Sequence, residues 1–222
     1  MKKMLIVSLM MILVLSLSPA QFGIKGGINL GTAGGDDKAI NPGMFNPLLS
    51  GFPSIQPTTR TGLTGGISYK VGLILGLSIQ PEVLYTQKGA IYEMSYTGVS
   101  GKGTFKFDYI DIPIVVRYAP LPIPFISPYL EAGVAYSTLL AAKFKAEDPT
   151  ESNETDIKDH LTKSDFSILL GVGVEVFMLD INARYVIGQT KMFNEDDPTT
   201  PFNESDLKMY NRAFVITAGL RF

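Results

Sequence analysis

The sequence predicts an eight-stranded antiparallel up-and-down transmembrane β-barrel, and three observations carry this prediction. An export signal precedes a chain that contains no later run of 18 apolar residues. The rest of the chain alternates apolar and polar residues with a period of two, as β-strands with one apolar face do. Long and short connections between the alternating segments follow one another in strict order. The first two observations allow an exported soluble protein or a membrane barrel, and the third favours the barrel.

Residues 1–20 have the three parts of a cleavable signal peptide. Two lysines begin it, an apolar run over residues 4–17 follows, and Ser18, Pro19 and Ala20 provide small residues at the −3 and −1 positions. We expect cleavage before Gln21, which leaves residues 21–222 as one barrel domain. A membrane anchor helix is the alternative, but the apolar run is shorter than the roughly 20 residues that a spanning helix needs.

Eight segments of the mature chain show the two-residue alternation that predicts strands. They cover residues 22–30, 61–71, 73–88, 104–118, 127–140, 165–177, 179–188 and 210–222.

The connections between these segments sort by length. Those after the first, third, fifth and seventh segments are long and polar, at residues 31–60, 89–103, 141–164 and 189–209. The other three are short and lie around Gly72, at residues 119–126 and around Met178. A meander then gathers all long connections at one end and both termini at the other, as in outer-membrane barrels with short periplasmic turns. We therefore expect the cell outer membrane as the location.

Aromatic residues on the apolar faces are predicted to form two belts. Near the short turns lie Phe22, Tyr69, Tyr118 and Phe222, and near the long loops lie Tyr85, Tyr136, Phe166, Tyr185 and Phe214. Amphipathic rings prefer the headgroup level of a bilayer, so two belts indicate that the apolar face meets lipid. The alternative is the general preference of aromatic residues for strands.

The opposite faces carry five basic and five acidic residues: Lys25, Lys70, Glu82, Asp111, Arg117, Glu131, Glu175, Asp180, Arg184 and Arg221. Eight strands leave an interior that side chains just fill. Isolated charges there would be costly, whereas paired charges cost far less. We predict a salt-bridge network that plugs the lumen; a path for protons or ions through these groups is the alternative.

Composition excludes several kinds of site. The chain has no cysteine, so disulfides and thiol catalysis are ruled out. A formal net charge of −2 gives no electrostatic footprint for nucleic acid. We expect no cofactor and no metal site, although the acidic long loops leave open divalent cations that bridge to lipopolysaccharide phosphates.

His160 is the single histidine and lies in a long polar loop. Small outer-membrane barrels that act as enzymes mostly need a histidine beside a serine or aspartate at the membrane rim. A solvated loop histidine is the simpler interpretation, so we predict no enzyme. A lipid-modifying enzyme built on His160 remains one alternative.

Residues 22–30, directly after the predicted cleavage site, resemble the opening strand of the Bacteroidota outer-membrane β-barrel family, often labelled "porin family" or PorT-like. Residues 80–85, 109–113 and 128–133 are similar to further stretches of that family. The terminal Phe222, behind alternating apolar residues, resembles the signal that barrel-assembly machinery recognises. More distantly, the chain resembles the eight-stranded OmpX and OmpA barrels, which are structural or adhesive. The resemblance implies fold and location and little about activity.

We therefore expect a non-enzymatic outer-membrane barrel with a structural, adhesive or partner-binding role. Its expected partners are outer-membrane lipid and lipopolysaccharide, the assembly machinery, and an external protein or glycan at the loops. The apolar residues of the first loop, at 41–56, are expected to fold over the barrel mouth or meet a partner. We expect a monomer. A small-solute channel is the main functional alternative. A lipocalin-like barrel is the rival fold, but it usually carries a tryptophan, which this chain lacks.

Overall fold

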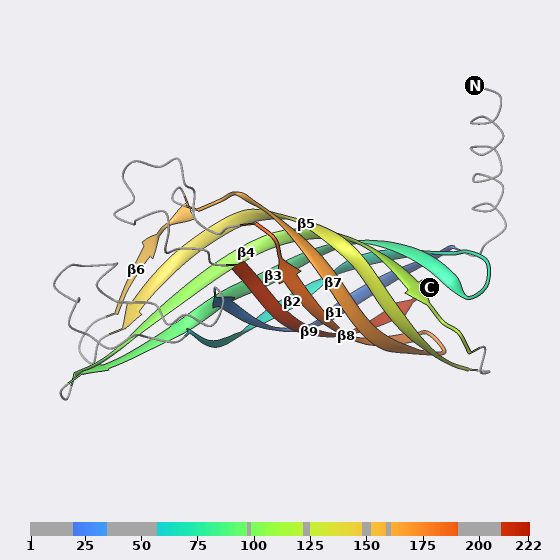
Figure 1. Ribbon diagram of the computed structural model, residues 1–222, viewed down its shortest axis with the longest axis horizontal. Coiled ribbons are helices and arrows are strands. Elements are labelled where there is room, and N and C mark those ends of the chain that lie inside the picture. The colour runs from blue at the N-terminus through green and yellow to red at the C-terminus, as the bar shows by residue number, and fades with distance from the viewer. Residues whose placement is uncertain are drawn as a thin grey trace, which may run out of the picture.

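A computed structural model describes residues 20–34, 57–96, 99–121, 125–147, 152–158, 161–190 and 210–222 (Figure 1). Residues 1–19 of the predicted signal peptide, the apolar first loop at 41–56 and His160 lie outside this part. The described strands are β1 (Ala20–Gly34), β2 (Pro57–Gly72), β3 (Leu77–Tyr96), β4 (Val99–Tyr118), β5 (Ile126–Glu147), β6 (Ser152–Asp156), β7 (Ser164–Val176), β8 (Leu179–Gly188) and β9 (Tyr210–Arg221). None of the described residues forms a helix long and apolar enough to cross a membrane.

Eight of these strands form a closed wall, which confirms the predicted fold. Each wall strand pairs antiparallel with the next one along the chain, with β5 followed by β7, and β1 pairs with β9 to close the barrel. The ninth strand, β6, pairs in the described part only with the outer end of β5. It is therefore an addition to one rim of the barrel and not a ninth wall strand.

The wall strands bury polar side chains inside and expose apolar side chains outside. On β1, Ile24 and Ile28 are exposed on the outer face, whereas Lys25 and Asn29 are buried. The same inversion runs through the other wall strands, where the exposed large hydrophobic residues alternate with buried polar ones. An apolar outer band is the arrangement that a bilayer selects. This inversion excludes the lipocalin-like alternative, whose apolar face would point inward.

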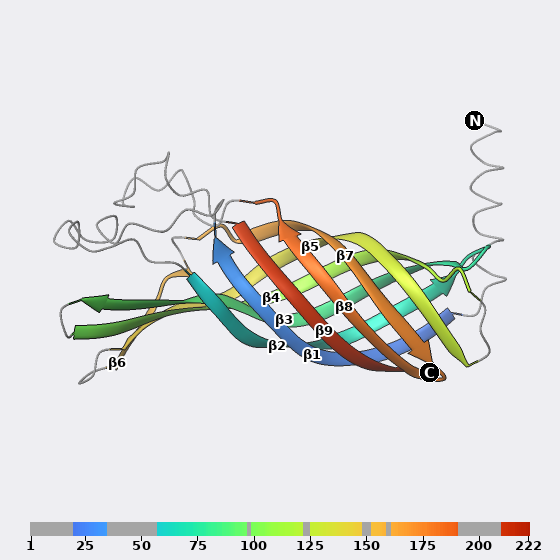
Figure 2. The same cartoon turned by 60° about the horizontal axis from the view of Figure 1, so that its bottom comes forward.

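The three short connections lie at one end of the barrel together with Ala20 and Phe222 (Figures 1 and 2). The turn between β2 and β3 occupies residues 73–76, so the prediction of a turn around Gly72 and a strand from Leu73 was wrong by four residues. The apolar residues 73–75 continue the strand-like composition, and the chain turns at Leu75 and Gly76, with φ of 58° and 76°.

Two of the predicted long loops are largely strand. Residues 89–96 belong to β3 and residues 99–103 to β4, and the two strands stay paired out to Tyr96 and Val99. Within the predicted loop 141–164, β5 continues to Glu147 and β6 pairs with its end. Figure 2 shows β3 and β4 projecting well beyond the rest of the wall. The sequence carried a signal here, because residues 142–147 alternate apolar with charged side chains and Ala90, Tyr92, Met94 and Tyr96 alternate along β3. The apolar residues of β3 change parity after Lys88, and the prediction ended the strand at that change.

Two irregularities mark where the wall passes into this projecting part. The β4–β5 register shifts between Asp108 and Tyr109, and the β2–β3 register shifts between Thr59 and Thr64. Such bulges bend and twist a strand locally. We call the paired segments beyond them, β3 from Gly89, β4 up to Phe107, β5 from Ala141, and β6, the sheet extension.

Candidate functional site in the barrel interior

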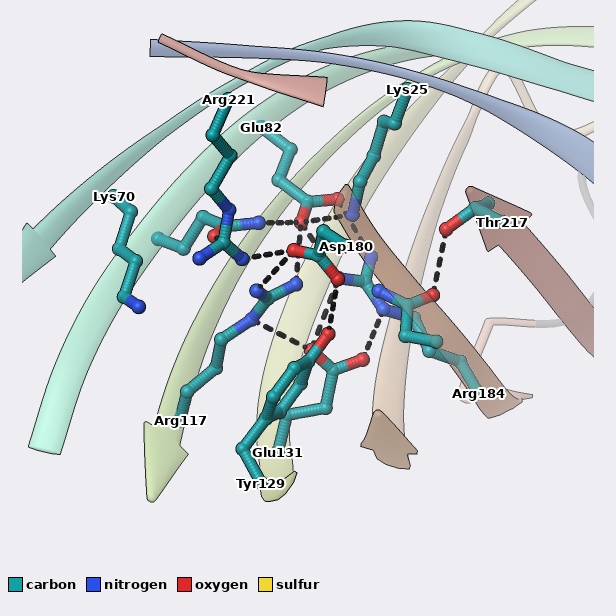
Figure 3. Close-up of polar contacts among 12 residues, drawn as sticks. Lys25, Lys70, Glu82, Arg117, Tyr129, Glu131, Asp180, Arg184, Thr217 and Arg221 are labelled. Atoms are coloured by element: carbon teal, nitrogen blue, oxygen red, sulfur yellow. Dashed lines mark hydrogen bonds and ion pairs between the residues drawn. The ribbon is translucent and has the colours of Figure 1, made fainter. Parts of the chain in front are cut away.

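The interior near the short turns holds nine of the ten charged residues predicted for the inner face, and Figure 3 labels all of these except Glu175. Every wall strand contributes at least one. Together they form what we call the interior cluster: Lys25, Lys70, Glu82, Arg117, Glu131, Glu175, Asp180, Arg184 and Arg221. Asp111 lies apart from them, nearer the opposite end of the barrel. The inward parity of each strand places these side chains, and the closure of the wall brings them together.

Arg184 lies at the centre of one half of the cluster. Its Nη1 and Nη2 atoms each donate to a carboxylate oxygen of Glu82 at 2.6 Å, and its Nε donates to Glu131. Glu82 also accepts from Lys25 Nζ at 3.0 Å and from Gln80 Nε2 at 2.6 Å. The carboxylates of Glu82 and Glu131 are thus paired with cations from strands that are distant in sequence.

Arg117 holds the other half together. Its Nη1 donates to Asp180 Oδ2 at 2.7 Å and its Nε donates to Glu131 Oε2 at 3.0 Å. The Tyr129 ring lies 4.3 Å from the guanidinium carbon, and the Tyr129 hydroxyl donates to Asp180 Oδ1 at 2.6 Å. Glu131 therefore joins the two halves, because it accepts from both Arg117 and Arg184.

The cluster reaches the turn-end mouth of the barrel through Arg221. This guanidinium pairs with Asp180 and, at 2.5 Å, with Glu175 Oε1. Glu175 also binds Lys70 Nζ at 2.8 Å, and both of these side chains are only partly buried. The contacts thus pass from the deep interior to a pair at the mouth.

Charge balance explains how such a cluster can be buried. Taking an ion out of water costs several kcal/mol even after relaxation, and attraction to a partner offsets that cost only with good geometry and further hydrogen bonds. Here each carboxylate has at least two cationic partners, and Arg184 binds Glu82 in the bidentate manner that strengthens such contacts. Five basic and four acidic residues leave a formal surplus of one positive charge.

An apolar patch lies next to the cluster, on the side of the barrel formed by β4, β5, β7 and β8. Val115, Ala135 and Leu169 are buried together on β4, β5 and β7, with Val186 of β8 packed against them. Leu84 of β3 is buried one position beyond Glu82 on the inner face.

A second group of polar side chains lies in the interior nearer the sheet extension. Lys88 Nζ binds Asp111 Oδ1 at 3.0 Å and Ser137 Oγ at 3.3 Å, and it lies 4.6 Å from the centre of the Tyr109 ring. Asp165 accepts from Asn211 Nδ2 at 3.0 Å, while its other oxygen has no hydrogen-bond partner among the described residues. Asp111 therefore has a partner of its own and does not join the interior cluster.

Sequence reasoning missed several of these inner residues. Lys88 and Asp165 have the inward parity of their predicted strands, and that parity was the available signal. Both lie at a predicted strand end, and neither was counted among the ten inner charges. Tyr129 and Gln80 also have the inward parity, but they carry no charge and were not counted with the ions.

All nine aromatic residues predicted for the membrane interface lie on the outer surface and are exposed. In the belt near the long loops, which we call the upper belt, Tyr136 pairs across strands with Phe166, and Tyr185 pairs with Phe214. In the lower belt, near the short turns, Phe22 pairs with Tyr69. Their depth in a bilayer stays a prediction.

The sheet extension carries a separate ion-pair group on its outer face. Glu154 of β6 accepts from Lys143 Nζ at 2.7 Å and from Lys106 Nζ at 3.0 Å. These hydrogen bonds, with the one from Lys143 contributing most, lower the pKa of Glu154 to about 2. Glu154 thus ties β6 to two strands, although Lys106 and Lys143 are opposed like charges.

No group of three or more histidine, cysteine, aspartate or glutamate residues within the described part could hold a metal ion. The predicted alternative of an enzyme at His160 falls outside that part and stays untested.

Comparison with known proteins gives one family match and several similar solved structures. No curated protein matches the chain. Among solved structures, it is similar to the attachment invasion locus protein Ail of Yersinia pestis, with 14% identity, 91% of this chain and 99% of that chain covered, and a TM-score of 0.40. It is also similar to Neisserial surface protein A, with 13% identity, coverage of 92% and 99%, and a TM-score of 0.45.

A third similar structure is the outer membrane protein OprG of Pseudomonas aeruginosa, with 11% identity, coverage of 92% and 97%, and a TM-score of 0.39. The assignment itself rests on a family match. The family described as outer membrane protein beta-barrel domain matches residues 13–194, which is most of the chain. The chain is therefore an outer-membrane protein that belongs to the outer membrane protein β-barrel domain family.

Proposed function

We propose that this protein is a non-enzymatic outer-membrane barrel with a plugged lumen, which presents its sheet extension to partners outside the cell. The length of three strands carries the proposal. β3, β4 and β5 have 20, 20 and 22 residues, whereas about 9–11 tilted residues cross a bilayer. The barrel wall does not need the additional length, so a role outside the membrane is the simplest reason for it.

The position of the extension supports a role in contact. Eleven residues separate the outward-facing Tyr85 from the end of β3 at Tyr96. At about 3.3 Å per residue, this is roughly 36 Å of strand beyond the level of Tyr85. Such a projection lies well clear of the lipid headgroups that the predicted upper belt would contact.

The chemistry of β6 suggests the kind of partner. A strand at a sheet edge leaves backbone N–H and C=O groups that can pair with an extended segment of another chain. All five residues of β6 are polar, which disfavours aggregation through this edge. An extended segment of an external protein therefore fits best, and a glycan is the other class that the exposed polar side chains could bind.

The arrangement of the interior supports the plugged lumen. Two groups of mutually paired charges fill the interior at different heights, and a buried apolar patch around Val115 lies on one side of it. Ions passing along the axis would have to displace these pairs, which is costly. The small-solute channel is therefore the less favoured function.

Other parts of the proposal rest on the sequence alone. They are the signal peptide, the Bacteroidota branch of the family, a monomeric state, contact with lipopolysaccharide, and recognition by assembly machinery.

A trimmed variant tests the role of the extension. Because Ala90 pairs directly with Phe105, residues 91–104 can be replaced by an Asn-Gly turn without changing the register of the wall. A photo-crosslinking amino acid at exposed Thr155 should capture an external protein on cells that carry the full chain, and much less on cells with the trimmed variant. The same amino acid at lipid-facing Val172 is the control. Equal capture by both forms at Thr155, or no capture by either, would contradict the proposal.

A further inference from the structure

The short turns at the end opposite the sheet extension are apolar and strongly exposed. The most exposed of their residues are Leu75 at 83%, Phe177 at 75% and Phe125 at 69%. Ile74, Leu121 and Met178 are also exposed. Turns in water usually consist of polar residues, glycine and proline, so this surface requires an explanation.

Backbone conformation makes the choice of residues more unusual. Leu75, Phe125 and Phe177 are the non-glycine residues of positive φ in the described chain, with φ of 58°, 69° and 54°, and there is one in each turn. The β2–β3 turn has the backbone hydrogen bond from Leu77 N to Ile74 O at 3.1 Å, with positive φ at both central residues. Hairpin turns of this kind favour Asn-Gly, and a bulky side chain in the left-handed region is strained.

Two costs therefore coincide at three independent positions. Glycine, asparagine or aspartate would relieve the left-handed backbone and would also remove exposed apolar surface from water. If these side chains lie in lipid, their apolar surface is no longer exposed to water, and its removal from water is favourable. Coincidence of both features in all three turns thus favours an apolar environment around them.

The surface of the turns bears no charge. Residues 73–76, 119–121, 125 and 177–178 contain no ionisable side chain. The nearest charged residues along the chain, Lys70, Arg117, Glu175 and Asp180, all take part in the interior cluster. A protein partner that recognises charge would find no charged side chain on these turns, whereas contact with lipid acyl chains does not require one.

Spacing places the turns within membrane reach. From the outward aromatic of the upper belt to the left-handed turn residue there are 10 residues for Tyr85 and Leu75, and 11 for Tyr136 and Phe125 and for Phe166 and Phe177. A transmembrane strand uses about 9–11 residues. The turns therefore fall at the opposite boundary of the same apolar band and not in the aqueous space beyond it.

Two of the turns also form one continuous surface. The Phe125 and Phe177 rings stack with centroids 5.1 Å apart, and Phe177 N donates to Phe125 O at 3.2 Å. This surface continues into the lipid-facing residues Ile126 and Leu179, which are exposed on the adjoining strands. We propose that the three turns insert into the periplasmic leaflet of the outer membrane and anchor that end of the barrel in lipid.

The absence of tryptophan from the chain gives a clean test. Single variants Phe125→Trp and Phe177→Trp keep an aromatic ring in each turn, and the full chain is reconstituted in phosphatidylcholine vesicles with brominated acyl chains. Val172→Trp on the mid-strand lipid face is the positive control, and Thr155→Trp on β6 is the aqueous control. A heat-dependent shift in gel mobility selects variants that have folded.

We expect bromine to reduce the fluorescence of both turn variants about twofold or more, as for Val172→Trp, and to leave Thr155→Trp unchanged. If both turn variants are quenched no more than Thr155→Trp, the anchor is overturned, and the surface is then available to a periplasmic protein or a second copy. Should one variant fail to fold, Leu75→Trp in the third turn replaces it under the same criterion.

Discussion

Arg184 shows at the scale of one residue how the barrel tolerates buried charge. Its guanidinium binds both Glu82 and Glu131, and each of these carboxylates also binds a second cation. Removal of one cation leaves carboxylates with fewer partners in a place that water hardly reaches. The cluster should therefore respond strongly to single substitutions and weakly to changes that keep its charges paired.

Replacement of Arg184 by methionine tests this dependence. Because the substitution breaks a buried pair on one side only, we expect a loss of about 3–5 kcal/mol in the free energy of unfolding. Urea unfolding in phospholipid vesicles measures it. Lys143→Met, which breaks an exposed ion pair of the sheet extension, is the control and should have a much smaller effect. Similar losses for the two variants would argue against the role of the cluster in stability.

Gly173 leaves space for the ring of Tyr129, the uncharged side chain that contacts Arg117 and Asp180. A Cβ atom at this position would lie 2.4 Å from the hydroxyl and Cζ of Tyr129, which pairs with Gly173 across β5 and β7. Gly173→Ala should displace the ring from Arg117 and Asp180 and destabilise the barrel by about 1–3 kcal/mol. Gly26→Ala, where the added atom has no neighbour closer than 3.8 Å, should be nearly neutral. Equal unfolding midpoints for both variants would contradict this packing role.

At the scale of elements, the sequence predicts a strand most accurately where one face meets lipid and the other face meets the polar interior. β8 has the predicted bounds of residues 179–188, because its residues alternate between lipid and a polar interior along their whole length. β3 continues eight residues past its predicted end at Lys88, because its apolar residues change from odd to even positions there and the strand was predicted to end at that change. β6 was missed because all five of its residues are polar.

The partners within the interior were beyond sequence reasoning. Parity of the strands predicted that Glu82 and Arg184 point inward, but they lie 102 residues apart on β3 and β8. Whether they meet depends on the stagger and tilt of the closed wall, which no local pattern records. The same limit separates Asp111 from the cluster, since only the height along the barrel distinguishes it.

The attachment of β6 gives a prediction on pH. An ordinary glutamate titrates near 4.5, and the lysine contacts lower the pKa of Glu154 to about 2. A lowered carboxylate pKa contributes stability above the ordinary value and loses it as the pH falls through the lowered one. β6 should therefore stay attached at pH 4, and carbonyl NMR of Glu154 should show a titration midpoint well below 4.5.

Lysine variants identify the cause of this shift. Lys143→Gln should raise the Glu154 midpoint more than Lys106→Gln, because the hydrogen bond from Lys143 is the larger cause. An unchanged midpoint in both variants would show that β6 is held by its backbone pairing alone.

At the scale of the whole molecule, the two ends of the barrel differ. One end has charge-free apolar turns, and the other has a long paired sheet with polar edges. Between them, all wall strands contribute to the interior cluster. Under the proposed function, the sheet extension binds partners, and the wall with its interior holds that extension at the cell surface.

Single-channel recording of the full chain in planar lipid bilayers tests the plugged lumen most directly. The paired charges that fill the interior predict no large stable conductance, at voltages where a porin run in parallel gives clear steps. Reproducible steps of porin size from the folded protein would contradict the proposal and favour transport through the lumen.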